Sequence, residues 1–198
     1  MREAQRFALV IIDMQNDFCD GEGAYARGGL DITPTRAILP RVGKAIHAAR
    51  RLGMAQIGTL FTVFEGVDGT PLTSTRLLRN RPFLAEYGFR LGDQGHEFSR
   101  ELPTPSHTVL KPRYSAFYGT PLEILLRNMG VNAIVVCGIT TNGGVETTVR
   151  DASLRDYEIY VLQDCVASFQ EEVTALSLAQ MADMATVLSR EEFFQSFI

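Results

Sequence analysis

The sequence has little of the residues from which disulfide frameworks and metal sites are built. Its 198 residues include three cysteines and three histidines. Cys19, Cys137 and Cys165 are too few and too scattered for a disulfide framework, which favours a cytoplasmic protein. The histidines are far apart in the chain, and none has H-x-H or H-E-x-x-H spacing. We therefore expect no metal ion and no other cofactor.

Long apolar runs and a basic excess are also missing. No apolar run is long enough to span a membrane. The charged segment Met1–Arg6 leads directly into a predicted strand, so no signal peptide is expected. The net charge of −4 and the pI of about 5.4 do not indicate the basic surface that nucleic-acid binding requires. We expect a small-molecule substrate as the partner, and neither nucleic acid nor a membrane.

Lysine is scarce, because 17 of the 19 basic residues are arginines. Where such a chain keeps a lysine, the position can require a compact ammonium whose pKa responds to its surroundings. Lys44 lies on a helical stretch among polar residues and is expected at the surface. Lys111 ends a short apolar strand and is the stronger candidate for a functional site.

Apolar runs alternate with helical periodicities along the chain. The continuous run Phe7–Ile12 predicts a central parallel strand that is buried on both faces. The alternation predicts an α/β fold with one parallel sheet and helices on both faces, in a single domain over residues 1–198. Further strands are expected at 55–63, 108–110, 133–137, 158–162 and 185–188, and helices at 33–52, 120–130, from about 145, and 171–184.

Residues 64–106 form a long irregular section that is rich in glycine and proline. Connections of this length are usually functional, so this section is expected to be a lid or an oligomer arm. Arg76, Arg79 and Arg81 cluster within it. They can bind a carboxylate or pair with acids of a neighbouring subunit, and the sequence favours neither interpretation.

Three predicted strands end in unusual groups: Asp13, Lys111 and the turn Gly138–Gly144. Open α/β sheets bind ligands at the carboxyl ends of their strands, although Asp13 can also simply cap a turn. An acid beside a lysine can hold or share a proton, and a turn that opens a helix offers N–H donors to negative charge. We expect the three groups to form one pocket. Asp17 and Asp20 look like solvated loop residues.

These motifs resemble the isochorismatase-like hydrolases, also called cysteine hydrolases, over essentially the whole chain. The motifs that carry the resemblance are Val10–Phe18, Lys111–Phe117, Gly138–Asn142 and Thr147–Ala152. The resemblance implies a three-layer α/β/α sandwich with a six-stranded parallel sheet of order 3-2-1-4-5-6, and a homodimer or homotetramer. It also implies a cis peptide at Ile139–Thr140.

The resemblance further implies an Asp–Lys–Cys triad whose first two members are Asp13 and Lys111. We assign substrate binding and oxyanion stabilisation to residues around this triad: Phe18, Tyr114, Phe117, Thr140, Thr141, Asn142 and Gly143. The position of the family's nucleophilic cysteine is held by Gly144, which cannot form a covalent intermediate. Among the three cysteines, Cys165 follows the fifth predicted strand at the same end of the sheet and is the alternative nucleophile.

Enzymes that hydrolyse isochorismate also have glycine at this position. In them the aspartate acts as a general acid on a vinyl ether, and water completes the cleavage. Gly144 fits that class, whereas Thr140-Thr141-Asn142 resembles the amidase branch. The chain lacks the Asp-x-His metal cluster of nicotinamidases, which argues against that assignment.

Three hypotheses follow from this mixture of features. The first is a hydrolase that uses Asp13, Lys111 and water on a small anionic metabolite with an ether, imine or amide bond; isochorismate-type cleavage is its leading form. The second is an amidohydrolase relative that has lost activity and serves as a binding or assembly subunit. The third is a cysteine amidohydrolase whose nucleophile was replaced by Gly144.

Overall fold

The structure is a computed structural model that describes residues 5–197. The chain folds around a six-stranded parallel sheet. Its order is β5-β2-β1-β6-β7-β8, and every neighbouring pair is parallel. Numbered by position in the chain this order is 3-2-1-4-5-6, so the predicted topology is confirmed. The strands are β1 (Phe7–Ile12), β2 (Ala55–Phe61), β5 (His107–Lys111), β6 (Ala133–Ile139), β7 (Glu158–Ala167) and β8 (Thr186–Leu188).

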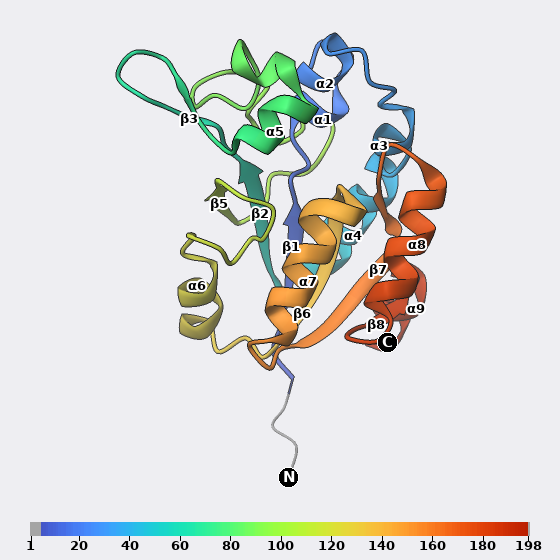
Figure 1. Cartoon of the computed structure of the whole chain (residues 1–198). Coiled ribbons are helices and arrows are strands. Elements are labelled where there is room, and N and C mark those ends of the chain that lie inside the picture. Colours follow the sequence, from blue (N-terminus) through green and yellow to red (C-terminus); the bar gives the residue numbers. More distant parts are fainter. Residues whose placement is uncertain (1–4, 198) are drawn as a thin grey trace.

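Helices cover both faces of the sheet (Figure 1). Because successive side chains of a strand point to opposite faces, β1 supplies both cores: Leu9 and Ile11 join one hydrophobic cluster, and Val10 and Ile12 join the other. Such burial of apolar surface is the main force that holds the layers together. The first cluster includes side chains of α4 and α9, and the second includes side chains of α6 and α7.

The helices begin and end close to the predicted bounds. The first predicted helix is interrupted at Ile38, and at its start the Asp31 carboxylate accepts from the Thr33 N–H at 2.8 Å. The C-terminal segment packs on the domain through Phe193 and Phe194. The helices are α1 (Asn16–Cys19), α2 (Ala24–Arg27), α3 (Thr33–Ala37), α4 (Leu39–Arg51), α5 (Thr75–Asn80), α6 (Leu122–Asn128), α7 (Glu146–Ser153), α8 (Glu171–Met181) and α9 (Arg190–Gln195).

The section 64–106 is less irregular than predicted. It contains a short antiparallel pair, β3 (Phe64–Glu65) and β4 (Pro71–Leu72), then α5 and a 3₁₀ turn over Pro82–Ala85. The hairpin of β3 and β4 projects from the body of the molecule (Figure 1). A role for this section as a lid or an oligomer arm stays a prediction.

The buried segment Gln15–Asp17 fixes this section to the end of β1. The Gln15 side chain accepts from the Phe61 N–H at 2.8 Å and donates to the His96 carbonyl at 2.8 Å. The Asp17 carboxylate accepts from the N–H groups of Ala24, at 2.9 Å, and Phe89, at 2.6 Å. The prediction that Asp17 is a solvated loop residue is therefore wrong, because its carboxylate joins two backbone segments in the interior. Asp20 is only partly exposed and pairs with Arg100.

Strand β7 is longer than the predicted strand 158–162 and continues to Ala167. The pairing with β6 shifts register within it: Val161 lies opposite Val136, but Val166 lies opposite Gly138. Extra residues on β7 are thus absorbed by an irregularity in the strand, which ends β7 beside the turn after β6. Within residues 5–197, no helix combines the length and apolarity that crossing a bilayer demands.

Candidate active site

Three strand ends meet at the carboxyl edge of the sheet, as predicted. Asp13 follows β1 in a left-handed backbone conformation (φ 49°), Lys111 ends β5, and Gly144 lies in the turn after β6. Asp13 Oδ2 is 2.7 Å from Lys111 Nζ. A β-carbon added to Gly144 would lie 3.2 Å from the same Asp13 oxygen. A side chain at position 144 would therefore begin in direct contact with the acid.

Asp13 is buried, and its carboxyl group has a second partner in Thr59 of β2. The Thr59 hydroxyl donates to Asp13 Oδ1 at 2.6 Å, and the Asp13 N–H donates to Thr59 Oγ1 at 3.1 Å. Burial raises the pKa of Asp13 above its ordinary value of 3.8, and the positive charge of Lys111 acts in the opposite direction. Sequence reasoning missed Thr59. The only available signal was a hydroxyl in the middle of an apolar strand.

Lys111 is buried beside Asp13 and does not line a cavity at the site. Its side chain is fully buried, its ammonium donates to the Arg113 carbonyl at 2.8 Å, and it lies 5.3 Å from the centre of the Phe61 ring. Lys111 is not among the residues that line the two cavities described below. A catalytic role for Lys111 stays a prediction; from this position it would act through the charge and orientation of Asp13.

The turn after β6 depends on a glycine at its entry. Gly138 has a φ of +116°, and a β-carbon there would lie 2.1 Å from the Ile12 carbonyl oxygen, so only glycine fits beside the end of β1. The Ile139–Thr140 peptide bond that follows is cis. The N–H groups of Gly143 and Val145 donate to the Thr140 carbonyl, and that of Asn142 donates to Ser168 Oγ. The predicted oxyanion donors Asn142 and Gly143 are therefore engaged within the protein.

A small cavity of about 30 Å³, here the inner chamber, lies over Asp13 and Gly144. A water molecule needs about 10–15 Å³ of such space, so the chamber admits one. Aromatic and aliphatic side chains form most of its wall. The residues that line it are Asp13, Phe18, Tyr25, Phe61, Leu77, Tyr114, Thr140 and Gly144.

A second cavity of about 400 Å³, here the outer cavity, adjoins the inner chamber. The two share four lining residues, Tyr25, Leu77, Tyr114 and Thr140. Its volume lies within the range of about 300–1,000 Å³ that is usual for small-molecule sites. The residues that line only the outer cavity are Leu30, Asn80, Arg81, Asn142, Gly143, Ser168, Phe169, Gln170 and Val173.

Five of the seven residues assigned to substrate binding line these cavities, and two do not. Phe18, Tyr114 and Thr140 line the inner chamber, and Asn142 and Gly143 line the outer cavity. Two predicted ligand contacts need correction. The Phe117 ring packs in the core, 5.8 Å from the ring of Tyr157 and under the Arg155 guanidinium, and Thr141 is fully buried away from both cavities.

Sequence reasoning also missed part of the site. Tyr25 lines both cavities, and its ring stacks on that of Phe169, with ring centres 4.9 Å apart and an angle of 12° between the planes. Burial raises the pKa of Tyr25 to about 12, so its phenol stays protonated and can donate a hydrogen bond. Neither residue belongs to a motif, and no local pattern marks them as neighbours.

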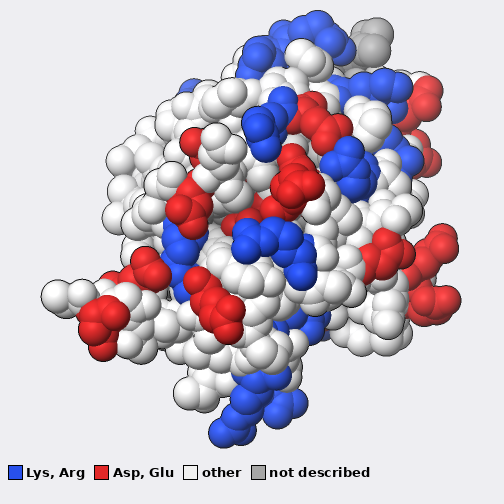
Figure 2. All heavy atoms as spheres, turned by 90° about the horizontal axis from the view of Figure 1, so that it is seen from above, with Lys and Arg blue, Asp and Glu red and all other residues white. Residues whose placement is uncertain are grey.

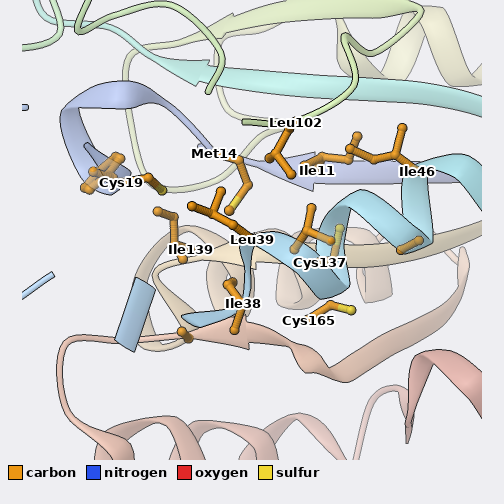
Figure 3. Close-up of a cluster of buried hydrophobic side chains, with 14 of the residues drawn as sticks. Ile11, Met14, Cys19, Ile38, Leu39, Ile46, Leu102, Cys137, Ile139 and Cys165 are labelled. Carbon is orange, nitrogen blue, oxygen red and sulfur yellow. The ribbon is translucent and has the colours of Figure 1, made fainter. Parts of the chain in front are cut away.

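The three cysteines lie in the core and do not line either cavity. Figure 3 shows Cys19, Cys137 and Cys165 within one cluster of buried side chains. Burial raises the pKa of the Cys19 thiol to about 12 and raises those of Cys137 and Cys165 as well. Cys165 lies inside β7 instead of in a loop, so it does not replace the missing nucleophile.

Charges of both signs are interspersed over the face seen from above, where the strands end (Figure 2). In the described part of the chain, no three His, Cys, Asp or Glu side chains are grouped so that they could hold a metal ion. The expectation of a metal-free site stays a prediction.

Comparison with known proteins agrees with this geometry. Residues 7–192 match the family model of the isochorismatase domain. The chain is 33% identical to the ureidoacrylate amidohydrolase RutB of Enterobacter sp. (strain 638) over 201 residues, which cover 96% of this chain and 84% of that protein.

Solved structures show the same likeness. A cysteine hydrolase from Pseudomonas syringae pv. phaseolicola 1448A has a TM-score of 0.81 at 26% identity, with 98% of this chain and 97% of that chain covered. An N-carbamoylsarcosine amidase from Thermoplasma acidophilum has a TM-score of 0.73 at 25% identity, with 94% and 97% covered. Because residues 7–192 of its 198 match the family model, this chain belongs to the isochorismatase family of hydrolases.

Proposed function

We propose that this protein hydrolyses a small anionic metabolite with Asp13, Lys111 and a water molecule, without a covalent intermediate. One observation carries the proposal: Asp13 and Gly144, which has no side chain, both line a chamber of about 30 Å³. A chamber of this volume has room for one water molecule beside the acid.

Isochorismate-type cleavage of a vinyl ether is the leading form of this reaction. Burial raises the pKa of Asp13, which favours the protonated form that a general acid requires, although the charge of Lys111 acts in the opposite direction. Asp13 gives its proton to the terminal vinyl carbon, and water adds to the cationic carbon that results. The hemiketal then releases the alcohol and pyruvate, and one proton returns to Asp13. The net reaction consumes one water molecule.

Lys111 has a supporting role in this scheme. Its ammonium is held by Asp13 Oδ2 and the Arg113 carbonyl, and its side chain has no exposed surface. When Asp13 loses its proton, the carboxylate that forms is stabilised by the adjacent positive charge. Lys111 thus limits the cost of ionising a buried acid and keeps Oδ2 aimed at the chamber.

The comparisons favour a second candidate, hydrolysis of a C–N bond, because two of the similar proteins are named as an amidohydrolase and an amidase. In that reaction Asp13 acts as the base: it takes a proton from water, the water oxygen attacks the carbonyl carbon, and the nitrogen leaves with a proton. The two candidates share the acid and the water molecule but release different products.

Product analysis distinguishes these candidates. We would incubate the protein with isochorismate and measure pyruvate with lactate dehydrogenase, and incubate it with ureidoacrylate and N-carbamoylsarcosine and measure ammonia. Asp13→Asn should lower the active reaction by about 10²–10⁴-fold, the usual contribution of a general acid or base. Asp31→Asn, at an exposed carboxyl, is the matched control.

Full activity in Asp13→Asn would refute the proposed mechanism. Tight binding of these compounds without any product would instead support a binding protein that has lost its activity.

A further inference from the structure

Arg81, which follows α5, presents a guanidinium without an acidic partner at the wall of the outer cavity. Its Nη1 donates to the Asn80 carbonyl at 2.8 Å, and its guanidinium carbon lies 5.7 Å from the centre of the Tyr25 ring. Its Nε is shielded from solvent and has no hydrogen-bond acceptor. Among residues 5–197, no carboxylate forms an ion pair with it.

An arginine in this state is unusual. A guanidinium has five N–H donors, and buried donors normally have partners because an unmet hydrogen bond is costly. The other two arginines of the cluster differ from it: Arg76 and Arg79 on α5 are exposed to solvent and do not line either cavity. The inward position is therefore a property of Arg81 and not of the cluster.

The cavity places Arg81 at a distance from the reacting position. Asp13 and Gly144 line only the inner chamber, and Arg81 lines only the outer cavity, while Tyr25 and Tyr114 line both. A ligand that reaches Asp13 with one end therefore extends between these two tyrosines toward Arg81. The protonated Tyr25 phenol gives this path a neutral donor beside the cation.

We propose that Arg81 binds a carboxylate of the substrate, at the end remote from the bond that is cleaved. The planar guanidinium matches a carboxylate, which can accept two N–H groups of one arginine. A carboxylate there would also supply an acceptor for the Arg81 Nε, which has none within the protein. The position of the scissile bond rests on the proposed function, whereas the carboxylate site rests on Arg81 and its cavity alone. The specificity that follows is for acids over their neutral esters.

The carboxylate site can be tested without catalytic turnover by comparing the binding of succinate with that of its neutral ester, dimethyl succinate. Isothermal titration calorimetry would compare the wild-type protein, Arg81→Gln and the matched control Arg79→Gln, with folding checked by circular dichroism. We expect the wild type and Arg79→Gln to bind succinate with equal affinity. Arg81→Gln should bind succinate at least about tenfold more weakly, as expected for loss of a charge-assisted contact. The ester should bind weakly to all three proteins. Arg81→Lys, which keeps the charge but loses the planar fork, should bind with intermediate affinity and serves as the variant of choice if Arg81→Gln does not fold.

Equal succinate affinity in Arg81→Gln and Arg79→Gln would overturn the proposal. Equal affinity of the wild type for the acid and the ester would also overturn it, and so would tight binding of inorganic phosphate in place of succinate. A third contradicting result is the absence of succinate binding at about 20 mM, since a Kd of 1 mM already corresponds to only about −4 kcal/mol. Retained activity in Asp13→Asn would refute the water mechanism but leave these binding results unchanged, so the two failures are distinguishable.

Discussion

Asp13 Oδ2 and Lys111 Nζ are 2.7 Å apart, and the two side chains are almost completely withdrawn from solvent. In a buried pair the mutual attraction offsets part of the large cost of removing each charge from water, and at Asp13 the effect of burial is the larger one. Loss of one partner leaves the other charge buried and unpaired. The pair is thus the part of the site where stability and chemistry are most closely connected.

Replacement of Lys111 should therefore be strongly destabilising. Lys111→Met is expected to lower the free energy of unfolding by about 3–5 kcal/mol, because it leaves the Asp13 carboxyl without its cation. Urea denaturation measures this directly. The only other lysine, Lys44, is exposed, and Lys44→Met should change the same quantity by no more than about 0.5 kcal/mol. Adding Asp13→Asn to Lys111→Met should recover part of the lost free energy of unfolding. Equal losses of stability in Lys111→Met and Lys44→Met would contradict the prediction.

The pH dependence of stability should carry the sign of the Asp13 shift. The pKa of Asp13 is raised in the folded protein, mainly by burial. Its stabilising contribution is therefore complete below the unfolded pKa, near 3.8, and is lost as the pH rises through the folded pKa. The free energy of unfolding of wild type minus that of Asp13→Asn should fall as the pH is raised above 3.8.

Asp31 provides a control of opposite sign. Hydrogen bonds from Thr33 lower the pKa of this exposed carboxyl. The difference between wild type and Asp31→Asn should accordingly decrease as the pH falls through the lowered pKa. If the Asp13 and Asp31 differences slope in the same direction with pH, the assigned shift of Asp13 is wrong.

The wild-type thiols should be inert in the folded protein. Alkylation requires an accessible thiolate, and burial raises the pKa of all three cysteines, that of Cys19 to about 12. We expect no adduct with iodoacetamide at pH 8 and three adducts in 6 M guanidinium chloride, counted by intact mass. A single adduct on folded Gly144→Cys would show that the inner chamber is reached from outside, and any adduct on the folded wild type would contradict the burial of its thiols.

The sequence predicted the parts of the fold that local patterns determine. Continuous apolar runs such as Phe7–Ile12 identified the buried strands, and Asp13, Lys111 and Gly144 were found because each stands at a strand end. The irregularity in β7 was not predictable, because polar Gln163 and Asp164 within a strand look like a turn.

The same limit applies to the burial of Asp17 and to the contact of Tyr25 with Arg81. Each depends on segments that are far apart in the chain and meet only after folding. A carboxylate surrounded by polar neighbours in sequence appears solvated until the donors that surround it in space are known. The walls of the cavities, unlike the strand ends, come from such long-range contacts.

Glycine at position 138 should be required by both space and backbone conformation. In Gly138→Ala the new β-carbon would meet the Ile12 carbonyl oxygen at 2.1 Å, in addition to the strain of a φ of +116°. Gly53 has a φ of +70° but nothing within 4 Å of its β-carbon, so Gly53→Ala carries the strain without the clash. Backbone strain of this kind costs about 1–3 kcal/mol. Thermal or urea unfolding should show a clearly larger loss for Gly138→Ala, and similar losses would mean that β6 moves away from Ile12 without cost.

Gly144→Cys should convert the chamber into the site of a thiol nucleophile. The new β-carbon would begin 3.2 Å from Asp13 Oδ2 and 2.8 Å from Ile12 Cγ2, so the Ile12 side chain must shift slightly while the acid is already in place. Asp13 can then accept the thiol proton, and the thiolate can attack an amide carbonyl. We expect ammonia release from ureidoacrylate or N-carbamoylsarcosine to appear or to rise in Gly144→Cys. It should vanish when Asp13→Asn is added to this variant. It should be absent in Gly144→Ala, which fills the same space without a thiol. If the wild type already releases ammonia as fast as Gly144→Cys, water suffices as the nucleophile for amides. If no variant does so, the scaffold is not an amidase that lacks only its cysteine, and vinyl ether cleavage becomes the better-supported form of the proposed reaction.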